Sequence, residues 1–343
     1  MYMKTFWKEI LVCLMMGLVV PGTLVDISGH ILKKTGRLPL VTEETVPVLI
    51  RQEPTEATVE KPKYSGPAIT LRMPDGSTRQ AELEEYLVGV VLAEMPASFE
   101  GEALKAQAVA ARTYAAKADL TGGKHGDGSI CTEDQCCQAW MDPEDYVNKG
   151  GLPQAVDKVR SAVEATAGEV LAYEGGLIEA TYFSCSGGST EDAKAVWGAD
   201  FPYLRAVDSP GEEQAQSYEE TRQFSKEKLE MLLGLTLPEK PEKWLGAITR
   251  TPGQGVDTIE LGGRTFTGVE LRGKLDLRST FFTAQSGDHG LVITTRGHGH
   301  RVGMSQYGAD AMAVAGKSYV EILGHYYQGT VLCSLEDIQK MGA

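Results

Sequence analysis

The feature that most limits how this chain can fold is an uncharged apolar run close to its start. Residues 10–25 read ILVCLMMGLVVPGTLV, and Lys4 and Lys8 precede them. A helix needs about 20 apolar residues to cross a bilayer, a length reached when flanking apolar residues lie at the two interfaces. No small-residue cleavage site follows the run, so we expect an uncleaved transmembrane signal anchor over residues 10–28. The short tail of residues 1–9 then stays in the cytoplasm, and the rest of the chain is extracytoplasmic.

Two further segments follow the anchor. Residues 29–67 mix Thr, Glu, Pro and Lys with little hydrophobic periodicity, which is typical of a linker. Residues 68–343 alternate helical and strand patterns irregularly, which predicts an α+β fold rather than a wound parallel sheet. We expect a single domain with a substrate groove, built in one lobe or two. Its helices are predicted over residues 83–95, 102–119 and 225–233, with β-like pieces over 244–295 and two short helices near the C-terminus.

Charge and cysteine content exclude two classes of protein. The 343 residues carry 33 Lys and Arg against 47 Asp and Glu, a net charge of −14, and the cations form no dense run. Because phosphate binding depends on cation-rich surfaces, nucleic acid is not expected as a ligand. Six cysteines are too few for a disulfide scaffold in a chain of this length.

One glutamate lies on the core-facing side of a predicted helix. Leu83, Leu87, Val90 and Val91 recur at helical spacing, and continuing their stripe reaches Glu94, after which Pro96 ends the helix. Burial and the negative end of a helix dipole both disfavour an ionised carboxylate, so its pKa should be raised. Such a glutamic acid suits general acid catalysis of glycosidic bond cleavage. The alternative is a glutamate that turns to solvent or pairs with an arginine.

Two further motifs carry reactive groups. The Ala-rich helix after Glu94 presents Arg112 on a flank from which it could reach a pocket, or form an ordinary ion pair. FSCSGGST places Cys185 between two serines at a strand end, but no general base stands at a fixed spacing. We therefore expect this loop to supply backbone donors to a groove rather than a nucleophile.

A Gly- and Asp-rich loop gathers four candidate metal ligands. KHGDGSICTEDQCCQAW contains His125, Cys131, Cys136 and Cys137. This donor set suits tetrahedral zinc, which would be structural because all four positions are filled. The alternative is a disulfide between Cys131 and one neighbour, which an oxidising compartment permits.

Four segments stand in order along the region after the linker: EYLVGVVLAEMPASFEGEALKAQAVAARTYA, CQAW, SGGSTEDAKAVWG and GHGHRVGMSQYGADAMAVAGKSYVEILGHYYQGT. Together they resemble the stage II sporulation protein D (SpoIID) family over nearly the whole of this region. Members of this family are membrane-anchored lytic transglycosylases that cut cell-wall glycan during engulfment of the forespore.

The resemblance implies a reaction and its residues. Glu94 would be the catalytic acid and base that breaks the bond between N-acetylmuramic acid (MurNAc) and N-acetylglucosamine without water, leaving a 1,6-anhydroMurNAc end, and this chemistry requires no cofactor. Arg112 would position the substrate, and some relatives are expected to carry a structural zinc with two His and two Cys. Groove-lining roles are implied for His300, Gln306 and Tyr307, and the affinity of sugars for aromatic faces adds Tyr203 and Tyr326, each of which could equally be a core residue.

The resemblance also implies a setting. It predicts peptide-free glycan strands as substrate, a cell-wall amidase and a membrane scaffold as partners, and a single-pass protein in the mother-cell membrane at the septum and the engulfing membrane. Two rival functions remain: a non-catalytic wall-binding or scaffold protein, and a zinc amidase built on His298 and His300. The roles of His298, Cys185 and Cys333 stay open.

Overall fold

The computed structural model describes residues 66–134 and 136–342, which belong to a compact unit spanning Val59–Ala343. The predicted anchor over residues 10–28 and nearly all of the predicted linker lie outside the described residues. Among the described residues, no helix is both long enough and apolar enough to span a bilayer. The predicted combination of helices and strands is confirmed, and the strands form several small sheets.

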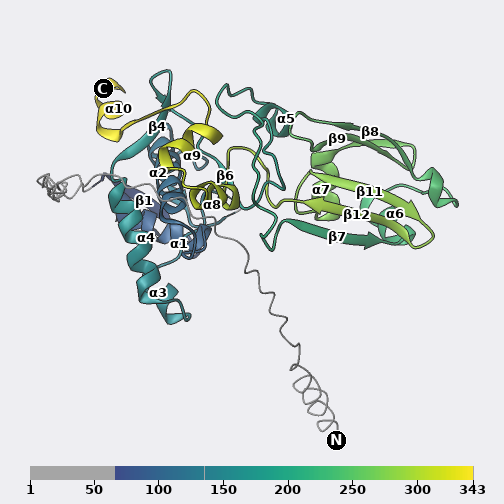
Figure 1. Ribbon diagram of the computed structural model, residues 1–343, viewed down its shortest axis with the longest axis horizontal. Helices are drawn as coiled ribbons and strands as arrows, with labels where there is room; N and C mark the ends of the chain where they lie inside the picture. Colours follow the sequence, from purple (N-terminus) through teal and green to yellow (C-terminus); the bar gives the residue numbers. More distant parts are fainter. Residues whose placement is uncertain (1–65, 135, 343) are drawn as a thin grey trace, which may run out of the picture. The chain divides into compact units, whose positions relative to one another are not determined.

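A first hydrophobic core surrounds two helices, α1 (Leu83–Glu94) and α2 (Gly101–Thr121) (Figure 1). The fully buried alanines of α2 let its neighbours approach closely. The other elements of this part of the chain are β1 (Ala68–Arg72), β2 (Thr78–Glu82), β3 (Ile130–Cys131), α3 (Pro143–Asn148), α4 (Pro153–Ala165), β4 (Glu169–Tyr173), β5 (Gly176–Leu177), β6 (Tyr182–Phe183), α5 (Ala193–Trp197), β13 (Met304–Ser305), α8 (Gln306–Val314), α9 (Tyr319–Tyr326), β14 (Val331–Ser334) and α10 (Leu335–Gly342).

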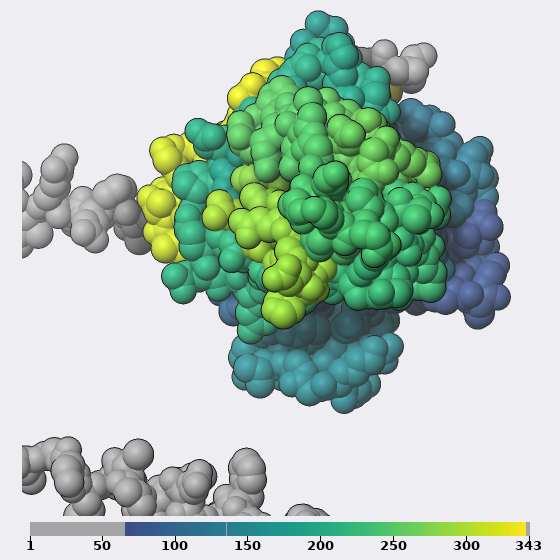
Figure 2. Space-filling model, turned by 90° about the vertical axis from the view of Figure 1, so that its right-hand side faces the viewer, coloured from purple at the N-terminus to yellow at the C-terminus, as the bar shows by residue number. Residues whose placement is uncertain are grey.

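A second core lies between two antiparallel sheets and the helices beside them. The sheets have the strand orders β10-β9-β8 and β11-β12-β7. In the space-filling view these segments, drawn in green, cover the centre of the visible face (Figure 2). The elements are β7 (Glu219–Phe224), α6 (Lys226–Leu233), the 3-10 helix η1 (Pro241–Lys243), β8 (Leu245–Arg250), β9 (Val256–Leu261), β10 (Arg264–Thr267), α7 (Gly268–Leu275), β11 (Phe282–Gly287) and β12 (Gly290–Arg296).

A buried arginine joins the two cores. Arg301 is fully buried and its guanidinium donates hydrogen bonds to the carbonyl oxygens of Ser186 at 2.9 Å, Ser189 at 2.6 Å and Gly253 at 2.6 Å. The carboxylate of Glu191, also buried, lies 3.6 Å from Arg301 and accepts the Gly253 N–H at 3.0 Å. Gly253 lies between β8 and β9, so these bonds attach the second core to the loops of the first.

A second buried ion pair lies inside the first core and involves Arg112. Its guanidinium donates to both carboxylate oxygens of Glu84, at 2.9 and 2.6 Å, and to the carbonyl oxygens of Val163 and Glu169. The Arg112 side chain is 0% exposed. This placement corresponds to the ion-pair alternative for Arg112 and leaves the guanidinium no open face toward a substrate.

This placement indicates that Arg112 stabilises the folded state. In Arg112→Gln the Glu84 carboxylate, which is 13% exposed, loses its partner, and we expect the free energy of unfolding to fall by about 3–5 kcal/mol. Urea unfolding measures the loss. The matched control is Arg160→Gln, because the Arg160–Glu85 pair is exposed and should contribute about 1 kcal/mol or less. Native stability together with weakened glycan binding in Arg112→Gln would instead support the substrate role.

Candidate active site

Glu94 is the last residue of α1, as the helical stripe predicts. The chain turns to an extended conformation at Met95, directly before Pro96, which cannot continue the helix. The side chain of Glu94 is half-buried. The stripe that leads to it is fully buried in the first core: Leu83, Leu87, Val90 and Val91.

Two hydrogen-bond donors hold the carboxyl group of Glu94. The backbone N–H of Ala139 lies 2.8 Å from Oε1, and the amide nitrogen of Gln306 lies 3.5 Å from Oε2. Burial raises the pKa of Glu94; the two donors oppose that rise, and the negative charge of Asp134 adds to it. The net effect is a raised pKa, so the acid form persists to higher pH than in an exposed glutamate.

Buried Gln138 precedes Ala139, whose N–H contacts Glu94, and is hydrogen-bonded to two tyrosines. Gln138 accepts a hydrogen bond from the Tyr86 hydroxyl at 3.0 Å and donates one to the Tyr182 oxygen at 2.9 Å. Burial raises the pKa of both tyrosines well above the ordinary range, and the charge of Glu94 adds to the effect. Both hydroxyls therefore stay protonated at neutral pH. The CQAW motif by itself predicts no role for Gln138, and no sequence pattern indicates one for Tyr182.

The C-terminal motif reaches Glu94 by running beside the CSGG loop. Backbone bonds join Cys185 to His298 in both directions, and β13 pairs in parallel with β6. Gly303 has a φ of 83°, and a Cβ there would lie 2.1 Å from the carbonyl oxygen of Thr181, so only glycine permits this approach. Gln306 follows β13 directly, and its amide thereby arrives at the carboxyl group.

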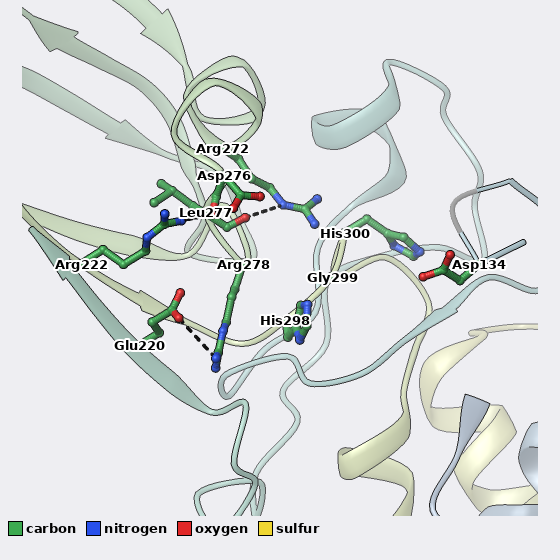
Figure 3. Close-up of a pocket in the computed structure, with 10 residues that line it drawn as sticks. All are labelled: Asp134, Glu220, Arg222, Arg272, Asp276, Leu277, Arg278, His298, Gly299 and His300. Carbon is green, nitrogen blue, oxygen red and sulfur yellow. Dashed lines mark hydrogen bonds and ion pairs between the residues drawn. The ribbon is translucent and has the colours of Figure 1, made fainter. Parts of the chain in front are cut away.

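The two histidines of this motif line a pocket of about 780 Å³ (Figure 3). His298 is exposed, whereas His300 is half-buried and its Nδ1 accepts the Val302 N–H at 3.1 Å. Burial, with a contribution from the Arg272 charge, lowers the pKa of His300 to about 4, so the imidazole is neutral at pH 7. The ring of Trp197, 43% exposed, lies 5.2 Å from that of His300 between centroids. Trp197 lies in the SGGSTEDAKAVWG segment, whose pattern alone predicts no role for it.

The predicted groove tyrosines lie in different surroundings. Tyr307 is half-buried with its ring edge-on to Phe99. Tyr203 is 7% exposed and its hydroxyl oxygen accepts the N–H of Glu179 at 3.1 Å. Tyr326 is 0% exposed and shares a hydrogen bond of 2.6 Å with Ser209. Tyr203 and Tyr326 therefore pack as core residues with satisfied hydroxyls, the alternative that the sequence left open for them.

Cys185 has the environment of a structural thiol. It is fully buried and its Sγ donates to the carboxylate of Glu212 at 3.1 Å. Burial and the Glu212 charge raise the pKa of Cys185 to about 12, so no thiolate is available at neutral pH. Glu212 also accepts the backbone N–H groups of Ser186 and Gly187, at 2.7 and 3.0 Å. These contacts argue against nucleophilic attack by Cys185. They also engage the Ser186 and Gly187 N–H groups with buried Glu212, so these two groups are not the expected donors to a groove.

The four predicted metal ligands come together. One ligand atom each from His125, Cys131, Cys136 and Cys137 lies within 4.8 Å of all the others. The Sγ atoms of Cys136 and Cys137 lie 3.8 and 3.6 Å from Nε2 of His125, and 3.9 Å from each other. Ligand atoms of tetrahedral zinc, with bonds of about 2.3 Å to sulfur, lie about 3.8 Å apart. The cluster can therefore hold a metal ion, and its cysteines form no disulfide.

The chain has relatives of known family along most of its length. The family model "SpoIID: Stage II sporulation protein" matches residues 76–173. Stage II sporulation protein D of Bacillus subtilis (strain 168) is 36% identical over 96% of this chain and 95% of its own length, and that of Bacillus amyloliquefaciens is 40% identical over 81% and 80%. This chain belongs to the SpoIID family. A Bacillus subtilis protein named "Amidase enhancer" is 32% identical over 72% of this SpoIID-family chain and 40% of its own length.

The raised pKa of Glu94 predicts a pH-dependent stability difference. The folded-state pKa lies above the ordinary value of 4.5, so ionising the buried carboxyl costs stability as the pH rises through the folded-state pKa. Glu94→Gln removes this cost. The variant should melt at a higher temperature than wild type above that pKa, and the difference should vanish as the pH falls below the unfolded value.

Thermal melts between pH 4 and 8 measure this difference, with the exposed Glu85 of the same helix as control. Glu85→Gln should show no such gain. A Glu94→Gln variant that is less stable than wild type at pH 8 would contradict a buried, electrostatically disfavoured carboxylate.

Proposed function

We propose that this protein is a peptidoglycan lytic transglycosylase in which Glu94 is the acid and the base. The observation that carries the proposal is the state of the Glu94 carboxyl, whose pKa is raised by burial while two donors contact its oxygens. The names of two relatives, a stage II sporulation protein and an amidase enhancer, support a sporulation and cell-wall setting.

The reaction needs a group that first gives and then takes a proton. Protonated Glu94 donates to the glycosidic oxygen as its bond to C1 of MurNAc breaks, and positive charge develops on C1 and the ring oxygen. The C6 hydroxyl oxygen then attacks C1, and its proton returns to ionised Glu94. The product carries a 1,6-anhydro ring, no water is consumed, and the enzyme ends in its starting protonation state.

The surroundings of Glu94 suit both halves of this cycle. Burial favours the acid before bond cleavage. The donors from Ala139 and Gln306 stabilise the carboxylate that exists between the two proton transfers. The exposed face of Trp197 and the half-buried ring of Tyr307 offer stacking surfaces for sugar rings.

We further propose that the cysteine cluster holds a structural zinc ion. Its donor set and spacing fit zinc, and four filled positions leave none for a substrate. The loop from His125 to Cys137 continues directly into Gln138 and Ala139, which contact Tyr182 and Glu94. A metal in this loop would therefore fix the backbone that positions the acid.

The cellular setting is proposed from the family. We place the protein in the mother-cell membrane by an anchor over residues 10–28, with its domain outside, where it acts on peptide-free glycan during engulfment. A cell-wall amidase that removes the stem peptides and a membrane scaffold would be its partners. The rival zinc amidase gains no support, because no metal-binding group that includes His298 or His300 occurs in the described part of the chain.

Product analysis tests the reaction and the role of Glu94 together. Wild type should release fragments with 1,6-anhydroMurNAc ends from peptide-free glycan, lighter by one water than hydrolytic products on mass spectrometry. Glu94→Gln cannot give a proton to the leaving oxygen, and its rate should fall by about 10²- to 10⁴-fold.

The control is Glu85→Gln, an identical substitution on an exposed face of the same helix, which should keep wild-type activity. Anhydro products from both wild type and Glu94→Gln at equal rates would remove Glu94 from its role. No products from either protein, with glycan binding intact, would favour the non-catalytic wall-binding protein.

Metal analysis tests the cluster. Purified protein should contain one equivalent of zinc per chain by inductively coupled plasma analysis, and Cys137→Ser should lose most of it and melt at a lower temperature. Cys333→Ser is the matched control, because Cys333 lies outside the cluster. Zinc-free wild type whose thiol titration reveals a disulfide within the cluster would contradict the proposal.

A further inference from the structure

The pocket beside the two histidines brings three arginines together with three carboxylates. The chain has a net charge of −14, yet three arginines line this one pocket of about 780 Å³. In Figure 3 their side chains come from one side, and Asp134 lies at the opposite end, beyond His300. Glu220 and Asp276 lie among the arginines at their end of the pocket, so the charge there depends on how each arginine is paired.

The three arginines differ in how their charge is balanced. Arg278 lies 3.3 Å from the carboxylate of Glu220, and Arg222 lies 3.6 Å from that of Asp276. Arg272, on α7, takes part in no ion pair within the described residues, and its Nε donates only to the carbonyl oxygen of Leu277, at 3.3 Å. Burial lowers the pKa of Arg272, which is the signature of a desolvated and uncompensated charge. An anion in the pocket would relieve that cost.

The pocket and the Glu94 carboxyl belong to one neighbourhood. Asp134 lines the pocket, and its charge contributes to the raised pKa of Glu94. His300 lines it too and has a backbone hydrogen bond with Tyr182, whose own pKa is affected by the Glu94 charge. A glycan strand held at Glu94 would therefore extend toward Arg272.

We propose that Arg272 is the centre of a site that binds a carboxylate of the peptidoglycan strand. This inference rests on the proposed function for the identity of the strand. The sugar rings are uncharged, and the anionic groups are the lactyl carboxylate of each peptide-free MurNAc and the carboxylates of stem peptides. An arginine with free N–H groups suits a carboxylate because its planar fork matches the two oxygens. The pocket is large enough for a sugar with its lactyl group.

The site explains a preference between strands in physical terms. In a peptide-free strand the lactyl carboxylate is a free anion attached directly to the sugar ring. In a peptide-bearing strand the same group is a neutral amide, and the nearest carboxylates lie farther out on the peptide. Arg272 would therefore select between the two strands by charge and by distance from the ring.

Binding measurements on the full chain test the site separately from catalysis. All measurements use the Glu94→Gln variant, so that strands are not consumed. Isothermal titration gives the Kd for three glycans. These are peptide-free glycan, peptide-free glycan whose carboxyls have been converted to amides by carbodiimide and methylamine, and peptide-bearing glycan. Peptide-free glycan should bind about tenfold more tightly than the amidated form, because an arginine–carboxylate bond is charge-assisted.

Substitution of Arg272 should abolish that difference. Adding Arg272→Gln should weaken binding of peptide-free glycan about tenfold and leave the amidated form unchanged, and Arg272→Lys should restore part of the loss. The control is Arg264→Gln, which removes the same charge from β10, outside the pocket. It should change neither the Kd for peptide-free glycan nor the Kd for amidated glycan.

The outcomes identify the source of the carboxylate and distinguish the carboxylate site from the proposed reaction. Tight, Arg272-dependent binding of peptide-bearing glycan would assign the bound carboxylate to the stem peptide. Arg272-dependent binding that is restricted to peptide-free strands assigns the bound carboxylate to the lactyl group. Equal affinities for peptide-free and amidated strands overturn the carboxylate site. Arg272-dependent binding without anhydro products from wild type would retain the site and refute the proposed reaction.

Discussion

The geometry of the site depends on the hydrogen bonds that the buried guanidinium of Arg301 donates. The guanidinium fixes the middle of the segment between β12 and α8 against the CSGG loop and against Gly253 of the second core. From this fixed point the chain presents His298 and His300 to the pocket on one side and Gln306 to Glu94 on the other. Burying the opposite charges of Arg301 and Glu191 costs desolvation energy. The buried pair holds the functional segment in one defined position.

The second constraint is the balance of forces on Glu94. Burial alone would raise the pKa until the carboxyl group is a weak acid, and strong donors alone would lower the pKa until the group is ionised at neutral pH and a weak base. The structure combines burial with one short donor from Ala139 and one long donor from Gln306. This combination is suited to a group that must hold a proton, release it and accept another within one catalytic cycle.

Local patterns in the sequence predicted those features whose cause is local. Helical periodicity placed Glu94 at the buried end of α1, and spacing within one loop gathered the ligands from His125 to Cys137. Periodicity could not show that Arg112 pairs with Glu84, 28 positions away. Nor could it find Gln138 or the arginine pocket, because these arise where distant segments pack together. The packing of the Tyr326 hydroxyl on Ser209 escaped prediction for the same reason.

Glu94 is proposed to drive cleavage without water. The most direct test is whether oxygen from the solvent enters the new MurNAc ends. Peptide-free glycan is digested in water enriched in oxygen-18, and the new MurNAc ends are isolated and weighed by mass spectrometry. The account predicts ends that carry no solvent oxygen, because the C6 oxygen of the sugar closes the ring. Reducing ends labelled with oxygen-18 would show that water is the nucleophile and would contradict the account.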